Sequence, residues 1–238
     1  MSKSCVCLYS GGMDSMVLFA HALREYDVVY PLTFDYGQRH RKEIKIAAEY
    51  LREYTAPGLM HQRIVDMKFY SQLAQSALTD LSIDVPKTKD IIGHPQSVTY
   101  VPNRNMVMLS IAAGFAESVK AQDVLTAIVA LDNLSGYYDC APEFVGALNN
   151  TLALNRLNRI EIKSPLVNMT KAEIIKQGVE WEVDFSQTWT CYKGEEISCG
   201  ECPSCSGRLA GFIDAKLIDP LPYAKDINWS KFGCKEIA

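Results

Sequence analysis

The chain has 238 residues and a net charge of −4, and its 48% hydrophobic and 22% charged residues are ordinary for one globular α/β domain with a small appendage. The acidic balance argues against a protein that mainly grips long nucleic acid, because that affinity comes largely from neutralised phosphates. No apolar run is long enough to span a membrane and no signal-peptide pattern opens the chain, so we expect a cytoplasmic protein without membrane contact.

Strand-like apolar runs alternate with helix-like segments through most of the chain. In order, hydrophobic spacing predicts a strand over 5–9, a helix over 13–23, a strand over 28–34, a helix over 44–54, a strand over 63–65, a helix over 105–120, a strand over 124–129, a helix over 142–155, a strand over 160–163 and a helix over 170–177. Thr170 and Glu173 have the spacing of a capping box, which marks the start of the last helix. This alternation predicts a parallel sheet with helices on both faces.

Two segments fall outside this alternation. Between residues 71 and 101, Pro86, Gly93 and Pro95 interrupt any long pattern, so we expect a loop-rich excursion that covers a site. From about Trp189 onward, the chain changes into short turns punctuated by cysteines.

The turn between the first strand and the first helix reads Ser10-Gly11-Gly12-Met13-Asp14-Ser15. Ligands of parallel sheets bind at the carboxyl ends of the strands, where this turn lies. Glycines let successive backbone N–H groups converge on an anion, and the helix N-terminus adds partial positive charge. The serine hydroxyls can donate to the same anion, and Asp14 suits a Mg²⁺ ion held against it. The sequence therefore predicts a phosphate site with magnesium.

A tight turn in which Asp14 or Ser15 caps the helix is the alternative reading of this segment. The complete motif, placed directly between strand and helix, favours the anion site. No lysine follows the glycines, so the loop differs from a Walker loop, and it also lacks the G-x-G-x-x-G spacing.

Four of the eight cysteines, Cys191, Cys199, Cys202 and Cys205, have the spacing C-x₇-C-x₂-C-x₂-C. In a chain without an export signal, such spacing favours metal thiolates over disulfides. Four thiolates complete a tetrahedral zinc shell that leaves no place for water, so we expect a structural zinc ion. An iron–sulfur cluster is the alternative, since spacing alone does not distinguish the two.

The glycine loop resembles the pyrophosphate loop of the N-type ATP pyrophosphatases, the PP-loop superfamily, which transfer AMP to a substrate oxygen. Five further stretches occur in order: FDYGQRHRKEI (34–44), YVPNRNMVMLSIA (100–112), SGYYDCAPEFVGALN (135–149), SPLVNMTKAEI (164–174) and TWTCYKGEEISCGECPSC (188–205). Together with the loop, they make the chain resemble the 7-cyano-7-deazaguanine synthase family along nearly its whole length.

The resemblance implies an ATP-dependent ligase of the queuosine pathway. Such an enzyme converts 7-carboxy-7-deazaguanine and ammonia into 7-cyano-7-deazaguanine through an adenylated carboxylate and an amide. The resemblance also implies a Rossmann-like fold (adenine nucleotide alpha hydrolase-like), the cofactors ATP, Mg²⁺ and Zn²⁺, no direct nucleic-acid binding, and a homodimer. It divides the chain into an ATP-pyrophosphatase-type domain over residues 1–187 and a small zinc-binding C-terminal region over residues 188–238, packed on the first.

Site residues follow from the same resemblance. The ATP-contact segment comprises Leu8, Tyr9, Ser10, Gly11, Gly12, Met13, Asp14, Ser15, Met16, Val17 and Leu18. Gln38, Arg39 and His40 are candidates for substrate or phosphate binding because they follow the second strand, and Arg104 because guanidinium matches phosphate and carboxylate. The stretch that resembles the base-binding region adds Tyr137, Asp139 and Glu143. A structural or solvated role is the alternative for Arg39, His40 and Arg104.

Three residues depart from the usual family pattern: Asn103 stands where glycine is usual, Tyr138 where proline is usual and Ala141 where arginine is usual. These changes fall where the acceptor is recognised. One alternative function is therefore a related adenylating ligase that stops at the amide or uses another acceptor, as in phage or antiphage-defence biology or in tRNA thiolation. A second alternative is a non-catalytic nucleotide-sensing zinc module, against which the intact Asp14 and serines count.

Overall fold

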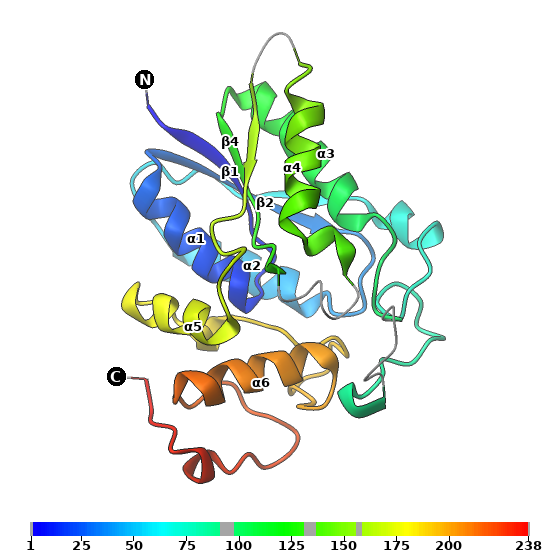
Figure 1. Ribbon diagram of the computed structural model, residues 1–238, viewed down its shortest axis with the longest axis vertical. Helices are drawn as coiled ribbons and strands as arrows, with labels where there is room; N and C mark the ends of the chain where they lie inside the picture. Colours follow the sequence, from blue (N-terminus) through cyan, green and yellow to red (C-terminus); the bar gives the residue numbers. More distant parts are fainter. Residues whose placement is uncertain (1, 91–97, 131–136, 156–158, 238) are drawn as a thin grey trace.

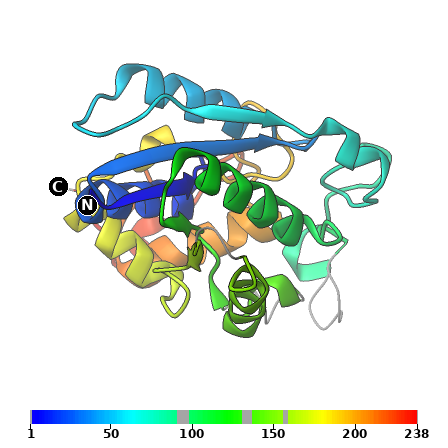
Figure 2. The same cartoon turned by 90° about the horizontal axis from the view of Figure 1, so that it is seen from above.

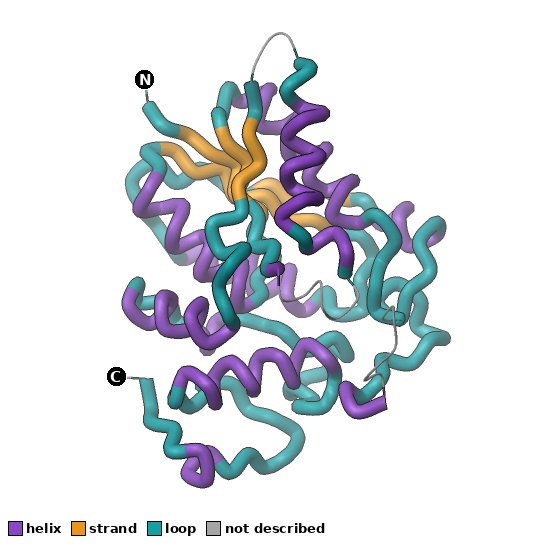
Figure 3. Tube along the Cα trace, viewed as in Figure 1, coloured by secondary structure: helices purple, strands orange, loops and turns teal. Residues whose placement is uncertain are grey.

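A five-stranded parallel sheet forms the centre of the computed structural model, which describes residues 2–90, 98–130, 137–155 and 159–237. The strand order is β3-β2-β1-β4-β5, and Figure 3 shows the strands in the middle of the molecule. The strands are β1 (Ser4–Leu8), β2 (Val28–Asp35), β3 (Arg63–Asp66), β4 (Asp123–Leu125) and β5 (Glu161–Lys163).

Helices cover both faces of this sheet, as Figures 1 and 2 show. The two faces carry α1 (Met13–Glu25) and α2 (Lys42–Glu53) on one side, and α3 (Arg104–Val119) and α4 (Pro142–Leu152) on the other. Successive side chains of a strand point to opposite faces. Accordingly, Val6 of β1 packs in the core under α3, whereas Cys5 and Cys7 pack in the core under α1.

The chain reverses its direction across the sheet beside β1. It first runs from β1 to β2 and β3 on one side, and then crosses through α3 to β4 and β5 on the other side. In open α/β sheets, the crevice at the carboxyl ends of the strands where this reversal occurs is the usual ligand position. The fold therefore predicts a ligand site at the loops that follow β1 and β4.

Two further helices form a layer outside α1. The helix α5 (Lys171–Glu180) packs on α1, and α6 (Pro203–Ala215) packs on α5 (Figure 1). The predicted capping box is present: Thr170 Oγ1 accepts a hydrogen bond from Glu173 N at 3.2 Å, and Thr170 N donates to Glu173 Oε2 at 2.7 Å. No helix in the described part of the chain combines the length and apolar character needed to cross a bilayer.

The predicted order of elements is confirmed, with two corrections. The strand predicted over 124–129 ends at Leu125, because the residues after it turn into the site. The cysteine-rich tail contains α6, where only short turns were expected, because Leu209, Phe212 and Ala215 lie at helical spacing and are buried on one face. In the predicted loop region, only short 3-10 turns such as Thr88–Asp90 are found in the described part; residues 91–97 lie outside it.

Packing between α5 and the core depends on a glycine. A Cβ added at Gly178 would lie 2.5 Å from Phe185 Cζ and 2.9 Å from Val17 Cγ2. We therefore expect Gly178→Ala to lower the free energy of unfolding by about 1–3 kcal/mol, although alanine is the better helix former. The matched control is Gly114→Ala in α3, where nothing lies within 4 Å of the added Cβ. This control should raise stability by about 0.5–1 kcal/mol in urea titrations, and a Gly178→Ala protein as stable as wild type would contradict the packing.

Candidate functional site

Two adjoining cavities, of about 290 and 280 Å³, lie at the carboxyl ends of β1 and β4. Residues from the glycine loop, α2 and α3 line both of them, among them Ser10, Asp14, Glu43 and Arg104. Tyr192 of the cysteine-rich segment also lines both cavities. Segments from most of the chain therefore converge on one cleft.

Gly11 fixes the shape of the glycine loop. Its φ angle is +89°, a conformation that side chains rarely adopt, and an added Cβ would overlap the Glu43 carbonyl oxygen. Its own carbonyl oxygen accepts a hydrogen bond from Trp189 N at 2.9 Å. Only glycine fits between these two contacts, so the first position of the Gly-Gly pair has a steric cause.

Hydrogen bonds inside the loop orient its hydroxyl groups. Ser10 Oγ accepts from Gly12 N at 3.1 Å, and Ser15 Oγ donates to Gly12 O at 2.9 Å. The helix-cap alternative is wrong, because Gly12 is the N-cap of α1 and no side chain caps it among the described residues. Gly12, Met13 and Asp14 line the first cavity, so the N-terminus of α1 presents its partial positive charge there.

Asp14 pairs with a lysine that sequence reasoning missed. Lys171 Nζ lies 2.7 Å from Asp14 Oδ2. The other carboxylate oxygen, Oδ1, is buried and has no hydrogen-bond partner among the described residues. A buried carboxylate oxygen without a partner is costly, and a hard cation such as Mg²⁺ would satisfy it. The residues present therefore fit a magnesium ion.

Lys171 carried one sequence signal that could have revealed its role. It is the first residue of α5, where the helix dipole disfavours a cation. The Asp14 carboxylate contacts this lysine and offsets its unfavourable interaction with the helix dipole. The capping box predicts the start of this helix from the sequence, so the unfavourable position of Lys171 could also have been recognised from the sequence.

Arg104 begins α3 and lines both cavities. Its Nη1 donates to the Tyr36 hydroxyl at 3.1 Å, and its guanidinium lies 5.6 Å from the centre of that ring. No salt bridge joins Arg104 to a carboxylate within the described ranges. A guanidinium that has no carboxylate partner and lines a cleft is suited to a phosphate or a substrate carboxylate.

Gln38, His40 and Glu43 form a buried polar group beside the loop. Gln38 Nε2 donates to Glu43 Oε1 at 3.2 Å, and His40 Nε2 lies 3.4 Å from the same oxygen. Burial raises the pKa of Glu43 to about 7. Burial, with Arg104 nearby, lowers the pKa of His40 to about 3, so this imidazole is neutral at physiological pH. Sequence reasoning missed Glu43, because an acidic residue early in an amphipathic helix is usually solvated.

The remaining candidates are divided between the cleft and other positions. Tyr137 lines the first cavity. Leu8, Tyr9, Gln38 and Ser10 line the second. Arg39 lines neither cavity. It donates hydrogen bonds to the carbonyl oxygens of Asp80 and Ile83, as the alternative of a structural arginine predicts. Outside the cleft also lie the buried Asp139, the exposed Glu143, and the core residues Met16, Val17 and Leu18.

Two of the residues that depart from the family pattern contact each other. Asn103 has a φ of +52°, which asparagine tolerates better than most side chains and which would also suit the glycine that the family resemblance leads us to expect there. Tyr138 Oη donates to Asn103 Oδ1 at 3.0 Å. Tyr100 Oη donates to Tyr138 Oη at 2.7 Å and accepts from Asn103 N at 3.0 Å. This closed ring joins the Tyr138–Cys140 turn to the start of α3.

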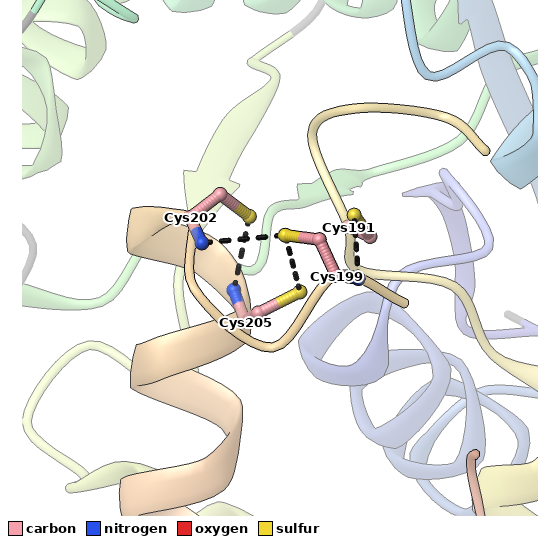
Figure 4. Close-up of side chains that lie close together, drawn as sticks. All are labelled: Cys191, Cys199, Cys202 and Cys205. Carbon is pink, nitrogen blue, oxygen red and sulfur yellow. Dashed lines mark hydrogen bonds between the residues drawn. The ribbon is translucent and has the colours of Figure 1, made fainter. Parts of the chain in front are cut away.

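The four cysteines form one buried cluster, shown in Figure 4. Their sulfur atoms all lie within 4.8 Å of one another. Backbone N–H groups point at the sulfurs: Cys199 N lies 3.4 Å from Cys191 Sγ, and Cys205 N lies 3.5 Å from Cys202 Sγ. Such N–H···S contacts stabilise thiolates around a metal ion. The cluster can therefore hold a metal.

The cysteine cluster also shapes the cleft. Trp189 and Thr190 on one side of Cys191, and Ser204 and Arg208 in α6, line the first cavity. The Arg208 guanidinium is itself fixed by Asp219, with Nε–Oδ2 at 2.6 Å and Nη2–Oδ1 at 2.9 Å. This segment therefore forms one wall of the cavity, and its position depends on the fold around the four sulfurs.

Comparisons with known proteins identify the family of this chain. The family model described as "Queuosine biosynthesis protein QueC" matches residues 4–216. The 7-cyano-7-deazaguanine synthase of Thermoplasma volcanium is 44% identical over 231 residues, covering 94% of this chain and 92% of that protein. The synthase of the same name from Pseudoalteromonas translucida is 42% identical over 228 residues, covering 94% of this chain and 100% of that protein.

Among solved structures, the U34-tRNA thiolase NcsA from Methanococcus maripaludis with its 4Fe-4S cluster matches with a TM-score of 0.49 and 16% identity, over 90% of this chain and 65% of that one. So distant a likeness bears on neither function nor ligand. The family model spans most of the chain, and both relatives cover it almost completely at more than 40% identity. The chain therefore belongs to the QueC family of queuosine biosynthesis proteins.

Proposed function

We propose that this chain is a nitrile-forming ligase that converts 7-carboxy-7-deazaguanine and ammonia into 7-cyano-7-deazaguanine with ATP. The observation that carries the proposal is the cleft itself, where the N-terminus of α1, the Arg104 guanidinium and Asp14 Oδ1, which has no hydrogen-bond partner among the described residues, meet. Both relatives are named for the nitrile product. That name disfavours the ligase that stops at the amide and the nucleotide-sensing module.

The reaction has two activation stages. In the first, a carboxylate oxygen of the substrate attacks the α-phosphorus of ATP and pyrophosphate leaves; ammonia then displaces AMP, which gives the amide. In the second, the amide oxygen attacks another ATP, and loss of AMP and protons leaves the nitrile. AMP is needed as the leaving group because a free carboxylate or amide oxygen leaves poorly.

The residues of the cleft have distinct roles in this proposal. Backbone N–H groups at the start of α1 and the hydroxyls of Ser10 and Ser15 bind phosphate oxygens. Arg104 binds the substrate carboxylate or the phosphate next to it. Mg²⁺, held by Asp14, would supply charge neutralisation for the leaving pyrophosphate. Lys171 holds Asp14 so that its second oxygen stays available.

We propose zinc as the metal of the cysteine cluster. Tetrahedral zinc with Zn–S bonds near 2.3 Å places its sulfurs about 3.8 Å apart. The four sulfur atoms lie within 4.8 Å of one another, which is close enough for all four to bind one ion. A cubane cluster separates its thiolates further, because iron atoms stand between them. The ion is structural, since four sulfurs leave no open position.

Other parts of the proposal rest on the family resemblance alone. They are the homodimer, the cytoplasmic location, ammonia as the nitrogen donor, and the division into a nucleotide-binding domain over residues 1–187 and a zinc-binding region over residues 188–238. The contact of α6 with α5 supports a C-terminal region packed on the main domain.

The first test of the proposal is product analysis. The protein is incubated with Mg-ATP, ammonium and 7-carboxy-7-deazaguanine, and the products are identified by mass spectrometry. We expect the nitrile together with AMP and pyrophosphate. An amide as the end product would contradict nitrile formation, and absence of AMP would contradict adenylation.

The second test concerns Asp14. Asp14→Asn should lower AMP formation by at least about 100-fold, since a neutral amide holds Mg²⁺ poorly. The control is Asp214→Asn, an exposed position in α6 outside both cavities, which should leave the rate unchanged. Asp214→Asn should retain the wild-type melting temperature, and Asp14→Asn, which loses the ion pair with Lys171, should remain folded at the assay temperature. Full turnover by Asp14→Asn would refute the magnesium assignment.

The third test concerns the metal. Elemental analysis of freshly purified protein should find about one zinc per chain, and Cys202→Ser should reduce this content to a small fraction. Cys234→Ser, outside the cluster, should keep it. Loss of the ion should also lower activity, because the cysteine-rich segment forms a wall of the first cavity. Iron in place of zinc would contradict the assignment.

A further inference from the structure

The proposed reaction requires a proton acceptor for nitrogen. At neutral pH, ammonia is present mostly as ammonium, which carries four protons, whereas the nitrogen of a nitrile carries none. Two protons leave as the acyl adenylate and ammonium become the amide and AMP. Two more leave as the amide is adenylated and loses AMP to form the nitrile. A base next to the nitrogen is therefore needed in both stages.

The cleft offers few groups that can take these protons. Among the described residues that line the two cavities, Asp14 and Glu43 are the carboxylates and His40 is the one histidine. Asp14 is paired with Lys171 and has its second oxygen placed for a cation. His40 is a weak base in this environment, because burial holds its pKa near 3. Glu43 remains.

Glu43 is well placed for such a role. It lies in the first turn of α2, its side chain is only 12% exposed, and it lines both cavities. Gln38 Nε2 and His40 Nε2 fix Oε1, at 3.2 and 3.4 Å. Oε2 accepts no hydrogen bond from a described residue. The Glu43 carboxyl group is thus held in place through Oε1, while Oε2 accepts a hydrogen bond from neither Gln38 nor His40.

We propose that Glu43 is the proton acceptor for the nitrogen in both stages of the reaction. This inference rests on the proposed function. The Glu43 carboxylate binds ammonium in the cleft, takes one proton so that the nitrogen lone pair can attack the acyl adenylate, and releases this proton to solvent. It then takes the second proton from the nitrogen of the tetrahedral adduct as AMP leaves. In the second stage it takes one proton from the nitrogen as the amide oxygen displaces pyrophosphate from ATP, and passes this proton to solvent. It takes the last proton from the adenylated amide as the C–O bond to AMP breaks and the C≡N bond forms.

The electrostatic surroundings favour this role. Burial raises the pKa of Glu43 to about 7, and Gln38 and Arg104 oppose this rise. A base whose pKa lies near the working pH can both accept and release a proton. The charged and titratable groups that share the cleft with Glu43 are Arg104 on α3, Asp14 on α1, Lys171 on α5, Arg208 on α6, His40 and Tyr36 ahead of α2, Tyr9 after β1, Tyr137 and Cys140 ahead of α4, and Tyr192 in the cysteine-rich segment.

The test separates nitrogen deprotonation from substrate activation. Hydroxylamine is largely unprotonated at neutral pH, so it traps the acyl adenylate as a hydroxamate without a base. For Glu43→Gln, which keeps the amide oxygen as an acceptor for Gln38, we expect hydroxamate formation close to the wild-type rate. Amide and nitrile formation from ammonium should fall by about 100-fold or more. The control, Glu49→Gln, changes a residue of α2 that lines neither cavity and should match wild type with both nucleophiles.

The pH dependence gives a second readout. With ammonium, the wild-type rate should rise as Glu43 ionises, with an inflection near pH 7. Glu43→Gln should lose this inflection and rise about tenfold per pH unit below the ammonium pKa, because only free ammonia then reacts.

Two results would overturn the inference while leaving the proposed function intact. One is a Glu43→Gln enzyme as fast as wild type with ammonium. The other is an equal loss with ammonium and hydroxylamine, which would mean that Glu43 serves substrate or ATP binding. A wild-type protein that forms neither hydroxamate nor pyrophosphate from the acid would instead contradict the proposed function, and this inference with it.

Discussion

A single close backbone approach organises the site. Gly11 lies against the Glu43 carbonyl oxygen with no room for a side chain, and its own oxygen is bound by Trp189 N. The loop after β1, the first turn of α2 and the cysteine-rich segment are thereby fixed to one point. The positions of Asp14, of the Glu43 carboxyl group and of the first cavity's wall all follow from this junction.

Charge is arranged around the junction by segments that are distant in sequence. Lys171 of α5 fixes one oxygen of Asp14, while Arg104 of α3 keeps its guanidinium free of carboxylate partners in the described part of the chain. Lys171 therefore forms an ion pair within the protein, whereas the Arg104 guanidinium remains available to a ligand. A cleft that contained only lysines and arginines would bind phosphate, but it would not offer a carboxylate for a metal or a proton. The mixture of cationic and anionic side chains suits a reaction that transfers both a phosphate-containing group and protons.

The sequence predicted the sheet, the glycine loop and the cysteine cluster because each has a local signal in spacing or composition. Glu43 and Lys171 escaped, because their role comes from burial and from a partner far along the chain. Arg39 and His40 are neighbours with the same strand-end signal, yet one bonds loop carbonyls and the other lines the cleft. Such differences arise from tertiary packing, which single-sequence patterns do not contain. The helix α6 was not predicted because the cysteine motif overlaps its N-terminal part, and the helical spacing of its apolar residues is a weaker signal than the cysteine spacing.

The junction at Gly11 also sets the order in which the protein can mature. Its partner Trp189 and the Asp14 partner Lys171 are made long after the loop itself, and β1 pairs with β4, whose residues begin at Asp123. Closing such long loops is slow, because chain entropy must be lost before the contacts form. During synthesis, the contacts that fix the glycine loop can therefore form only after Trp189 has been made. A nascent chain that ends before residue 171 lacks both Trp189, the partner of Gly11, and Lys171, the partner of Asp14.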